Sequence, residues 1–246
     1  MHDLRRLKEI QSIERKIAAK HEMLPGYEAW IAGLLEAERE KGDVDKGEIL
    51  PTIMIWCIDT GDFERALELA RYVLRNEVPL PARYDRQAPC LIAEEISEAA
   101  LKLLNEGQAF SIDVLEQLDE LTADEDMPDE VKAKLMKAIG FEYLRQADAA
   151  DSGGEGEDRL NFLRAAALAP LRRAQQLHDR CGAKTAIKRL EKLLKAAAAT
   201  PPASPPPAAE AGAANDNTPP ADETGDDNAS ADGRPGETES PDNTGS

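Results

Sequence analysis

Apolar residues recur at three- and four-residue steps along most of the first 199 residues, and this period is typical of helices. In the stretch WCIDTGDFERALELARYVL, residues 56–74, an apolar helix ends at Gly61 and an amphipathic helix begins after Asp62. Glycine suits the left-handed turn after a helix, and an aspartate accepts hydrogen bonds from the free N–H groups of the next one. The stretch therefore predicts two antiparallel helices packed as a hairpin, with Trp56 and Phe63 on facing sides of its core.

The same period predicts helices along the rest of this region. They cover residues 4–24, 27–41, 49–59, 91–104, 111–121 and 128–146, and a last helical region runs from 160 to 195 with a kink or restart at Pro170. The prolines of VPLPARYDRQAP, residues 78–89, predict an extended connection, because each disfavours helix in the residue before it. No segment alternates as a strand would, so we expect an all-α fold of helical hairpins packed as a bundle.

The C-terminal residues 200–246 differ in composition from the rest. They contain no Leu, Ile, Val, Phe, Tyr or Trp and so offer no apolar surface to offset the entropy of the chain. We interpret them as a disordered, acidic, proline-rich tail. The foldable part then consists of a basic amphipathic helix over residues 1–24 and an all-helical core over residues 25–199 that ends in a basic helix.

The formal charge of −18 is unevenly distributed. The tail holds ten acidic residues and one arginine. In contrast, residues 171–195 hold eight basic and two acidic residues, and residues 1–20 hold six basic and three acidic residues. Either basic end could contact phosphates, because that attraction needs no single geometry. The alternative is a solvated face, or one that docks the acidic middle of the chain. At the N-terminal end, the candidate DNA contacts are Arg5, Arg6, Arg15 and Lys16. At the C-terminal end, they are Arg172, Arg173, Lys188, Arg189 and Lys192. The C-terminal basic residues that could also contact phosphates are Arg180, Lys184 and Lys195.

An acidic cluster is the strongest candidate for chemistry. The stretch ADEDMPDEVKAK, residues 123–134, contains five carboxylates that could hold Mg²⁺ for phosphodiester cleavage. Carboxylates in a first helical turn, with proline at its start, are also the ordinary response to the helix dipole. We favour this structural interpretation for the whole set, which comprises Asp124, Glu125, Asp126, Asp129 and Glu130.

Other catalytic and cofactor motifs are missing from the sequence. The three histidines lack a second ligand at helical spacing, and the glycines of residues 153–156 lack the Lys-Ser/Thr of a phosphate-binding loop. Cys57, Cys90 and Cys181 are far apart and odd in number, which fits neither a disulfide framework nor a cysteine metal site. There is no 18-residue apolar run. We predict no catalytic residue, no metal, no cofactor and no membrane contact, and a cytoplasmic location.

Three stretches together resemble a known family. They are LPGYEAWIAGLLE, MIWCIDTGDFERALELARYVLRNEVPLP and LTADEDMPDEVKAKLMKAIG. In combination they resemble the small terminase subunit of tailed double-stranded DNA phages, a family also labelled terminase endonuclease subunit, over residues 4–195. The resemblance implies a homo-oligomer in the cytoplasm of the bacterial host, which binds double-stranded phage DNA at the packaging site. It also implies a partner, the terminase large subunit, which holds the ATPase motor and the nuclease.

Two features depart from that family and leave alternatives open. Its members tend to carry a further basic N-terminal segment and a Lys/Arg-rich tail, whereas this chain starts close to its first helix and ends in an acidic, proline-rich tail. Such a tail repels DNA at low salt and could restrain binding or reach a protein partner. One alternative function is metal-dependent nicking by this chain, from the family label and the acidic cluster. Another is a helical adaptor, because GDFERALELARYVL also resembles a tetratricopeptide helix, although a solenoid needs about three stacked repeats.

Overall fold

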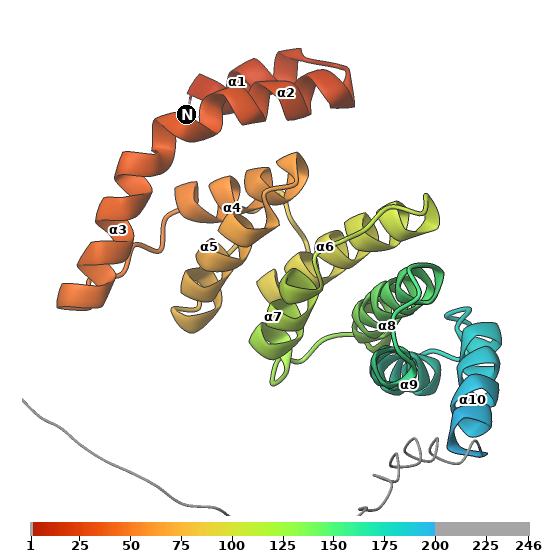
Figure 1. The fold of residues 1–246 in the computed structure, drawn as a ribbon. Helices are drawn as coiled ribbons and strands as arrows, with labels where there is room; N and C mark the ends of the chain where they lie inside the picture. The colour runs from red at the N-terminus through yellow and green to blue at the C-terminus, as the bar shows by residue number, and fades with distance from the viewer. Residues whose placement is uncertain (1, 200–246) are drawn as a thin grey trace, which may run out of the picture. The chain divides into compact units, whose positions relative to one another are not determined.

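The computed structural model describes residues 2–199 of the chain. Every regular element in this range is a helix, so the all-α prediction is confirmed. Figure 1 shows the helices following one another in chain order, from α1 and α2 in red to α10 in blue. No helix within the described range is long and apolar enough to cross a bilayer. The tail predicted over residues 200–246 lies outside the described residues.

The N-terminal segment forms two helices, α1 (His2–Glu9) and α2 (Ile13–Met23). The single helix predicted over residues 1–24 was therefore wrong. Ser12 has extended backbone between the two helices, and its hydroxyl accepts from the Arg15 backbone N–H at 3.4 Å, which caps α2. The interruption turns Ile13 outward, where it is 75% exposed. A short 3-10 helix, η1 (Leu24–Tyr27), then leads into α3 (Glu28–Lys41).

The predicted hairpin is formed by α4 (Ile49–Thr60) and α5 (Phe63–Arg75). Gly61 has a positive φ of 82°, and the Asp62 side chain accepts from the Arg65 backbone N–H at 3.2 Å. Both local predictions are thus confirmed. All of residues 50–58 are buried, which explains why α4 is apolar on every side.

Trp56 and Phe63 of the hairpin each find an aromatic partner outside it. Trp56 is 3% exposed and packs edge-on against Tyr27, with ring centroids 6.0 Å apart. Phe63 is half-buried, and its ring centroid lies 5.0 Å from that of Phe110. The hairpin is therefore held to the elements that come before it and after it in the chain.

The second half of the chain contains α6 (Ala88–Asn105), α7 (Ile112–Thr122), α8 (Asp129–Ser152), α9 (Glu157–Leu177) and α10 (Lys184–Ala199). The Ser111 hydroxyl accepts from the Val114 backbone N–H at 3.4 Å and so caps α7, as predicted. The helix does not restart at Pro170, which lies inside α9. The chain leaves the helix at His178, whose backbone is extended, and restarts at Lys184.

Helices α8 and α9 pack closely because Gly140 has no side chain. A Cβ at this position would lie 2.5 Å from Leu171 Cγ and 3.0 Å from the Ala167 carbonyl oxygen. Leu171 is fully buried in a cluster that also holds Leu144, Ala167, Leu168, Ala183 and Leu190. Leu190 belongs to α10, so this cluster fixes the basic C-terminal helix on the α8–α9 pair.

Candidate nucleic-acid interface

Helix α10 separates its apolar residues from its lysines. Leu190 is fully buried, and Ile187 and Leu194 pack partly against the same cluster. Four exposed lysines follow one another at steps of four, four and three residues. At 3.6 residues per turn, these steps place all four within an arc of about 80° around the helix axis. They lie opposite the buried leucine, and we name them the α10 lysine stripe: Lys184, Lys188, Lys192 and Lys195.

The ammonium groups of the α10 lysine stripe have no carboxylate partner. Within residues 2–199, no ion pair or side-chain hydrogen bond involves any of the four, whereas other basic residues nearby are paired. The first turn of α10 also has no acid, although α8 and α9 begin with acidic residues. Because a helix N-terminus carries a partial positive charge, this end of α10 adds to the field of the lysines.

Two of the three C-terminal arginines of the predicted set are paired with carboxylates, unlike its lysines. The Arg172 guanidinium donates to Glu191 of α10 at 2.6 and 3.2 Å, and that of Arg189 donates to Asp148 of α8 at 2.6 and 3.2 Å. These contacts neutralise both arginines within the chain. Arg173 is exposed on α9 without an ion-pair partner among the described residues. The structure therefore unites Lys188 and Lys192 of the set and assigns Arg172 and Arg189 a structural contact.

The selected set left out Lys184 and Lys195, which complete the α10 lysine stripe. The signal that would have found them is their spacing from Lys188 and Lys192, because the helical region predicted over residues 160–195 already contains all four lysines.

The N-terminal basic residues do not form a comparable stripe. Arg5 lies on α1, whereas Arg15 and Lys16 lie on α2, and none of these three has an ion-pair partner within residues 2–199. The Arg6 guanidinium pairs with the Glu22 carboxylate at 3.0 Å and so joins α1 to α2. This end therefore offers separate positive charges on two helices.

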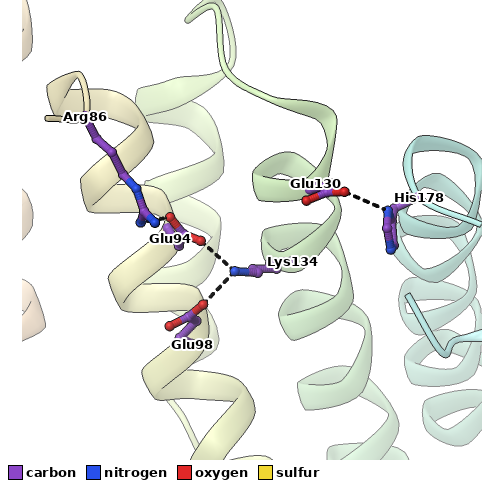
Figure 2. Close-up of polar contacts among 6 residues, drawn as sticks. All are labelled: Arg86, Glu94, Glu98, Glu130, Lys134 and His178. Atoms are coloured by element: carbon purple, nitrogen blue, oxygen red, sulfur yellow. Dashed lines mark hydrogen bonds and ion pairs between the residues drawn. The ribbon is translucent and has the colours of Figure 1, made fainter. Parts of the chain in front are cut away.

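The acidic cluster lies at the start of α8. Pro128 precedes the helix, and Asp129 and Glu130 form its first turn, as the structural interpretation requires. Asp124, Glu125 and Asp126 do not follow that interpretation, because they lie in the connection between α7 and α8. No group of three or more His, Cys, Asp or Glu side chains in the described part of the chain is arranged to hold a metal ion. Figure 2 shows the Glu130 carboxylate directed at the His178 imidazole, with Oε1 3.7 Å from Nδ1.

A groove of about 590 Å³ lies between α6, α8 and the turn before α10. Its lining includes Glu98 and Lys134, which belong to a chain of ion pairs that Figure 2 shows running from Arg86 through Glu94 to Lys134 and Glu98. The Lys134 ammonium lies 2.6 Å from the carboxylates of both Glu94 and Glu98. The charges around Lys134 therefore cancel, in contrast to those of the α10 lysine stripe.

The pKa values of this network follow from its contacts. Burial raises the pKa of Glu94, but Lys134 and Arg86 lower it by more, so that the net direction is downward. Burial likewise lowers the pKa of Lys134, and its two carboxylate partners raise it by more. Glu94 stays ionised and Lys134 stays protonated near neutral pH, as expected of a structural tie between α6 and α8 rather than an acid–base pair.

Comparisons with known proteins agree on one family. The family model described as phage small terminase subunit matches residues 1–130. The chain is 41% identical over 193 residues to the "Terminase, endonuclease subunit" of Escherichia phage P2, covering 78% of this chain and 70% of that protein. It is 24% identical over 157 residues to the "Probable terminase, endonuclease subunit" of Haemophilus phage HP1 (strain HP1c1), covering 64% of this chain and 55% of that protein. No solved structure matches the chain.

Proposed function

Because the chain belongs to the phage small terminase subunit family, we propose that it binds double-stranded viral DNA at the packaging site and recruits or regulates the large ATPase/nuclease subunit. The observation that carries the DNA-binding part is the α10 lysine stripe, whose four exposed ammonium groups have no partner among residues 2–199. Unpaired positive charge on one face of a helix is the electrostatic feature that phosphates require.

The length of the α10 lysine stripe suits a duplex. Lys184 and Lys195 are 11 residues apart, which is about 17 Å along a helix at 1.5 Å per residue. Duplex DNA carries one phosphate per about 1.7 Å of its axis, so about ten phosphates lie within that length. Contacts of this kind position a protein on DNA without reading its sequence, so the stripe supplies affinity and orientation.

The distribution of charge along the chain favours approach of DNA from the side of α10. Residues 1–199 carry a net negative charge, and eight of their basic residues are concentrated in residues 171–195. DNA is repelled by the acidic middle of the chain and attracted to the α10 lysine stripe, which favours approach from that side.

The proposed role includes assembly of several copies and contact with the large subunit. Ile13 and Ile17 lie one turn apart on α2 and are 75% and 36% exposed. Large apolar side chains in this position are the kind of surface that assembly covers. Native mass spectrometry of the Ile13→Ser variant against the wild type tests this face, because loss of the higher-mass species is expected.

A second candidate function is intrinsic nicking, which the names of both relatives favour, because each contains the words endonuclease subunit. The residues that would carry it are Asp126, Asp129 and Glu130, two of which open α8. The test incubates the purified chain with Mg²⁺ and supercoiled phage DNA. Nicking that disappears when the three residues are changed to Asn, Asn and Gln would support it.

The proposed function is tested by binding to phage DNA fragments with and without the packaging region. Titrations over a range of salt concentrations should show tighter binding to the fragment that contains the region, together with the steep salt dependence of phosphate contacts. Addition of the large subunit should then yield a ternary complex on the same fragment. Equal affinity for both fragments would contradict site recognition, and no complex with the large subunit would contradict recruitment.

A further inference from the structure

The groove between α6, α8 and the turn before α10 has the size of a binding site. Its volume of about 590 Å³ lies within the range of about 300–1,000 Å³ that is typical of binding pockets. Leu101 of α6, Ala133 of α8 and Cys181 of the turn give it an apolar lining. A large apolar side chain of a partner can therefore be buried there.

Three charged groups of the groove are free to pair with a partner. Lys102 of α6 and Lys137 of α8 have no carboxylate partner among residues 2–199, and Glu106 has no basic partner there. By contrast, Figure 2 shows the Lys134 ammonium between two carboxylates, each at 2.6 Å. The two free ammonium groups and one free carboxylate leave one positive charge, which a single carboxylate of a partner balances.

The outward face of α2 carries groups that complement this groove. Ile13 and Ile17 lie one helical turn apart and are 75% and 36% exposed, while α2 packs its other face against α4 and η1. Glu14 is exposed beside them and has no basic partner in the described part of the chain. Apolar anchors at positions i and i+4 are those by which an amphipathic helix binds in a groove.

We propose that α2 of one copy binds in the groove of a second copy, with Ile13 and Ile17 against the apolar lining and the Glu14 carboxylate beside the free ammonium groups; this contact rests on the assembly included in the proposed function. Because Ile13 is 75% exposed, α2 does not fill the groove of its own chain. The two surfaces differ, so the contact is head-to-tail and repeats from copy to copy in one direction.

The other exposed large apolar side chains suit the groove less well. Phe162 is 59% exposed, but the Arg159 guanidinium lies over its ring, 5.6 Å from the centroid. This side chain would bring a further cation to the two free ammonium groups. Val44 is 38% exposed and lies outside the helices, without a second anchor one turn away. Within residues 2–199, α2 is the one helix that exposes two large apolar side chains.

Disulfide trapping tests the contact on the full-length chain. Cys181 already lines the groove, so the Ile13→Cys variant supplies the second thiol on α2. Oxidised glutathione should join residue 13 of one copy to Cys181 of another. Multimers on non-reducing gels and mass spectrometry of the linked peptides should show this bond. The matched control is Phe162→Cys, which places a thiol at another exposed apolar position and should form no link to Cys181.

A mixing experiment tests the same contact without added cysteine. Analytical ultracentrifugation compares an α2 variant, Ile13→Ser, Ile17→Ser, with a groove variant, Lys102→Glu, Lys137→Glu. Each alone should raise the dissociation constant between copies at least about tenfold, because one loses apolar burial and the other repels Glu14. An equimolar mixture should form a dimer and nothing larger, because only the α2 of the groove variant and the groove of the α2 variant are intact.

Circular dichroism at 222 nm should show both variants folded, since none of the four side chains is buried. The contact is overturned if residue 13 links only to residue 13 of another copy, or if residue 162 links to Cys181 instead. It is also overturned if the groove variant assembles like the wild type, including the case in which it loses only its complex with the large subunit. These results leave the proposed DNA binding intact, whereas a wild-type chain that stays monomeric would contradict the proposed assembly and this contact together.

Discussion

Replacement of Gly140 by alanine tests how closely α8 and α9 pack. The added Cβ would lie 2.5 Å from Leu171 Cγ and 3.0 Å from the Ala167 carbonyl oxygen, and neither neighbour has free space because Leu171 is fully buried. Overpacking of this kind costs about 1–3 kcal/mol, and the backbone oxygen cannot move without the helix, so we take the upper value. Alanine gains about 1 kcal/mol over glycine in a helix. We therefore expect Gly140→Ala to lower the free energy of unfolding by about 2 kcal/mol.

The matched control is Gly33→Ala on α3. Nothing lies within 4 Å of a Cβ at this position, so only the helix propensity changes, and stability should rise by about 0.5–1 kcal/mol. Urea unfolding followed by circular dichroism at 222 nm measures both variants. In a Leu171→Ala background most of the clash is removed, so Gly140→Ala should cost 1–3 kcal/mol less than in the wild type. A Gly140→Ala chain as stable as the wild type would refute the close packing of α8 on α9.

Four further substitutions have definite expected outcomes. Trp56→Ala should lower the free energy of unfolding by about 3–5 kcal/mol in urea titrations, whereas Phe63→Ala should cost about 2 kcal/mol because its ring is only half-buried. Glu142→Gln should cost about 2–3 kcal/mol and lower the Tm, because this buried carboxylate accepts from Arg145 Nη2 at 2.6 Å; an unchanged Tm would contradict this. Glu94→Gln should destabilise the chain at pH 7 but much less at pH 3, because the folded-state pKa of Glu94 is lowered and its contribution is lost as pH falls through that pKa. If Glu94→Gln lowered the free energy of unfolding equally at pH 7 and pH 3, the charge of Glu94 would not be what stabilises the chain.

Local chemistry explains the elements that could be predicted from the sequence. Gly61 and Asp62 define the α4–α5 turn through the backbone freedom of glycine and the side-chain acceptor of aspartate, both of which act within a few residues. Ser111 at the start of α7 and Pro128 at the start of α8 act in the same way. These features need no knowledge of the rest of the fold.

The errors occurred where distant contacts decide the outcome. Of the kink or restart predicted at Pro170, the restart does not occur, because the proline lies inside α9, where the neighbouring Leu171 is buried beside Gly140 of α8. The N-terminal helix divides at Ser12, although the spacing of its apolar residues would have allowed one continuous helix. Neither the close contact at Gly140 nor the outward position of Ile13 can be read from local sequence.

The sequence predicts where basic residues are concentrated, but it does not predict which of them are paired with carboxylates in the fold. Composition located the basic residues 171–195 correctly at one end of the foldable region. The partners of Arg172 and Arg189 lie 19 and 41 residues away, so only the fold distinguishes the neutralised arginines from the unpaired lysines.

The central claim is that the α10 lysine stripe contacts the phosphates of DNA. The salt dependence of DNA binding tests this claim most directly. The full-length variant Lys184→Gln, Lys188→Gln, Lys192→Gln, Lys195→Gln is compared with the wild type on a duplex that contains the packaging region. The matched variant neutralises four N-terminal residues instead: Arg5→Gln, Arg6→Gln, Arg15→Gln, Lys16→Gln.

At about 0.9 per phosphate contact, loss of the α10 lysine stripe should reduce the slope of log Kobs against log salt concentration by about 3 to 4, and loss of the N-terminal charges should reduce it by less than 1. An unchanged slope in the stripe variant, or a reduction found only in the N-terminal variant, would contradict the assignment of DNA binding to α10.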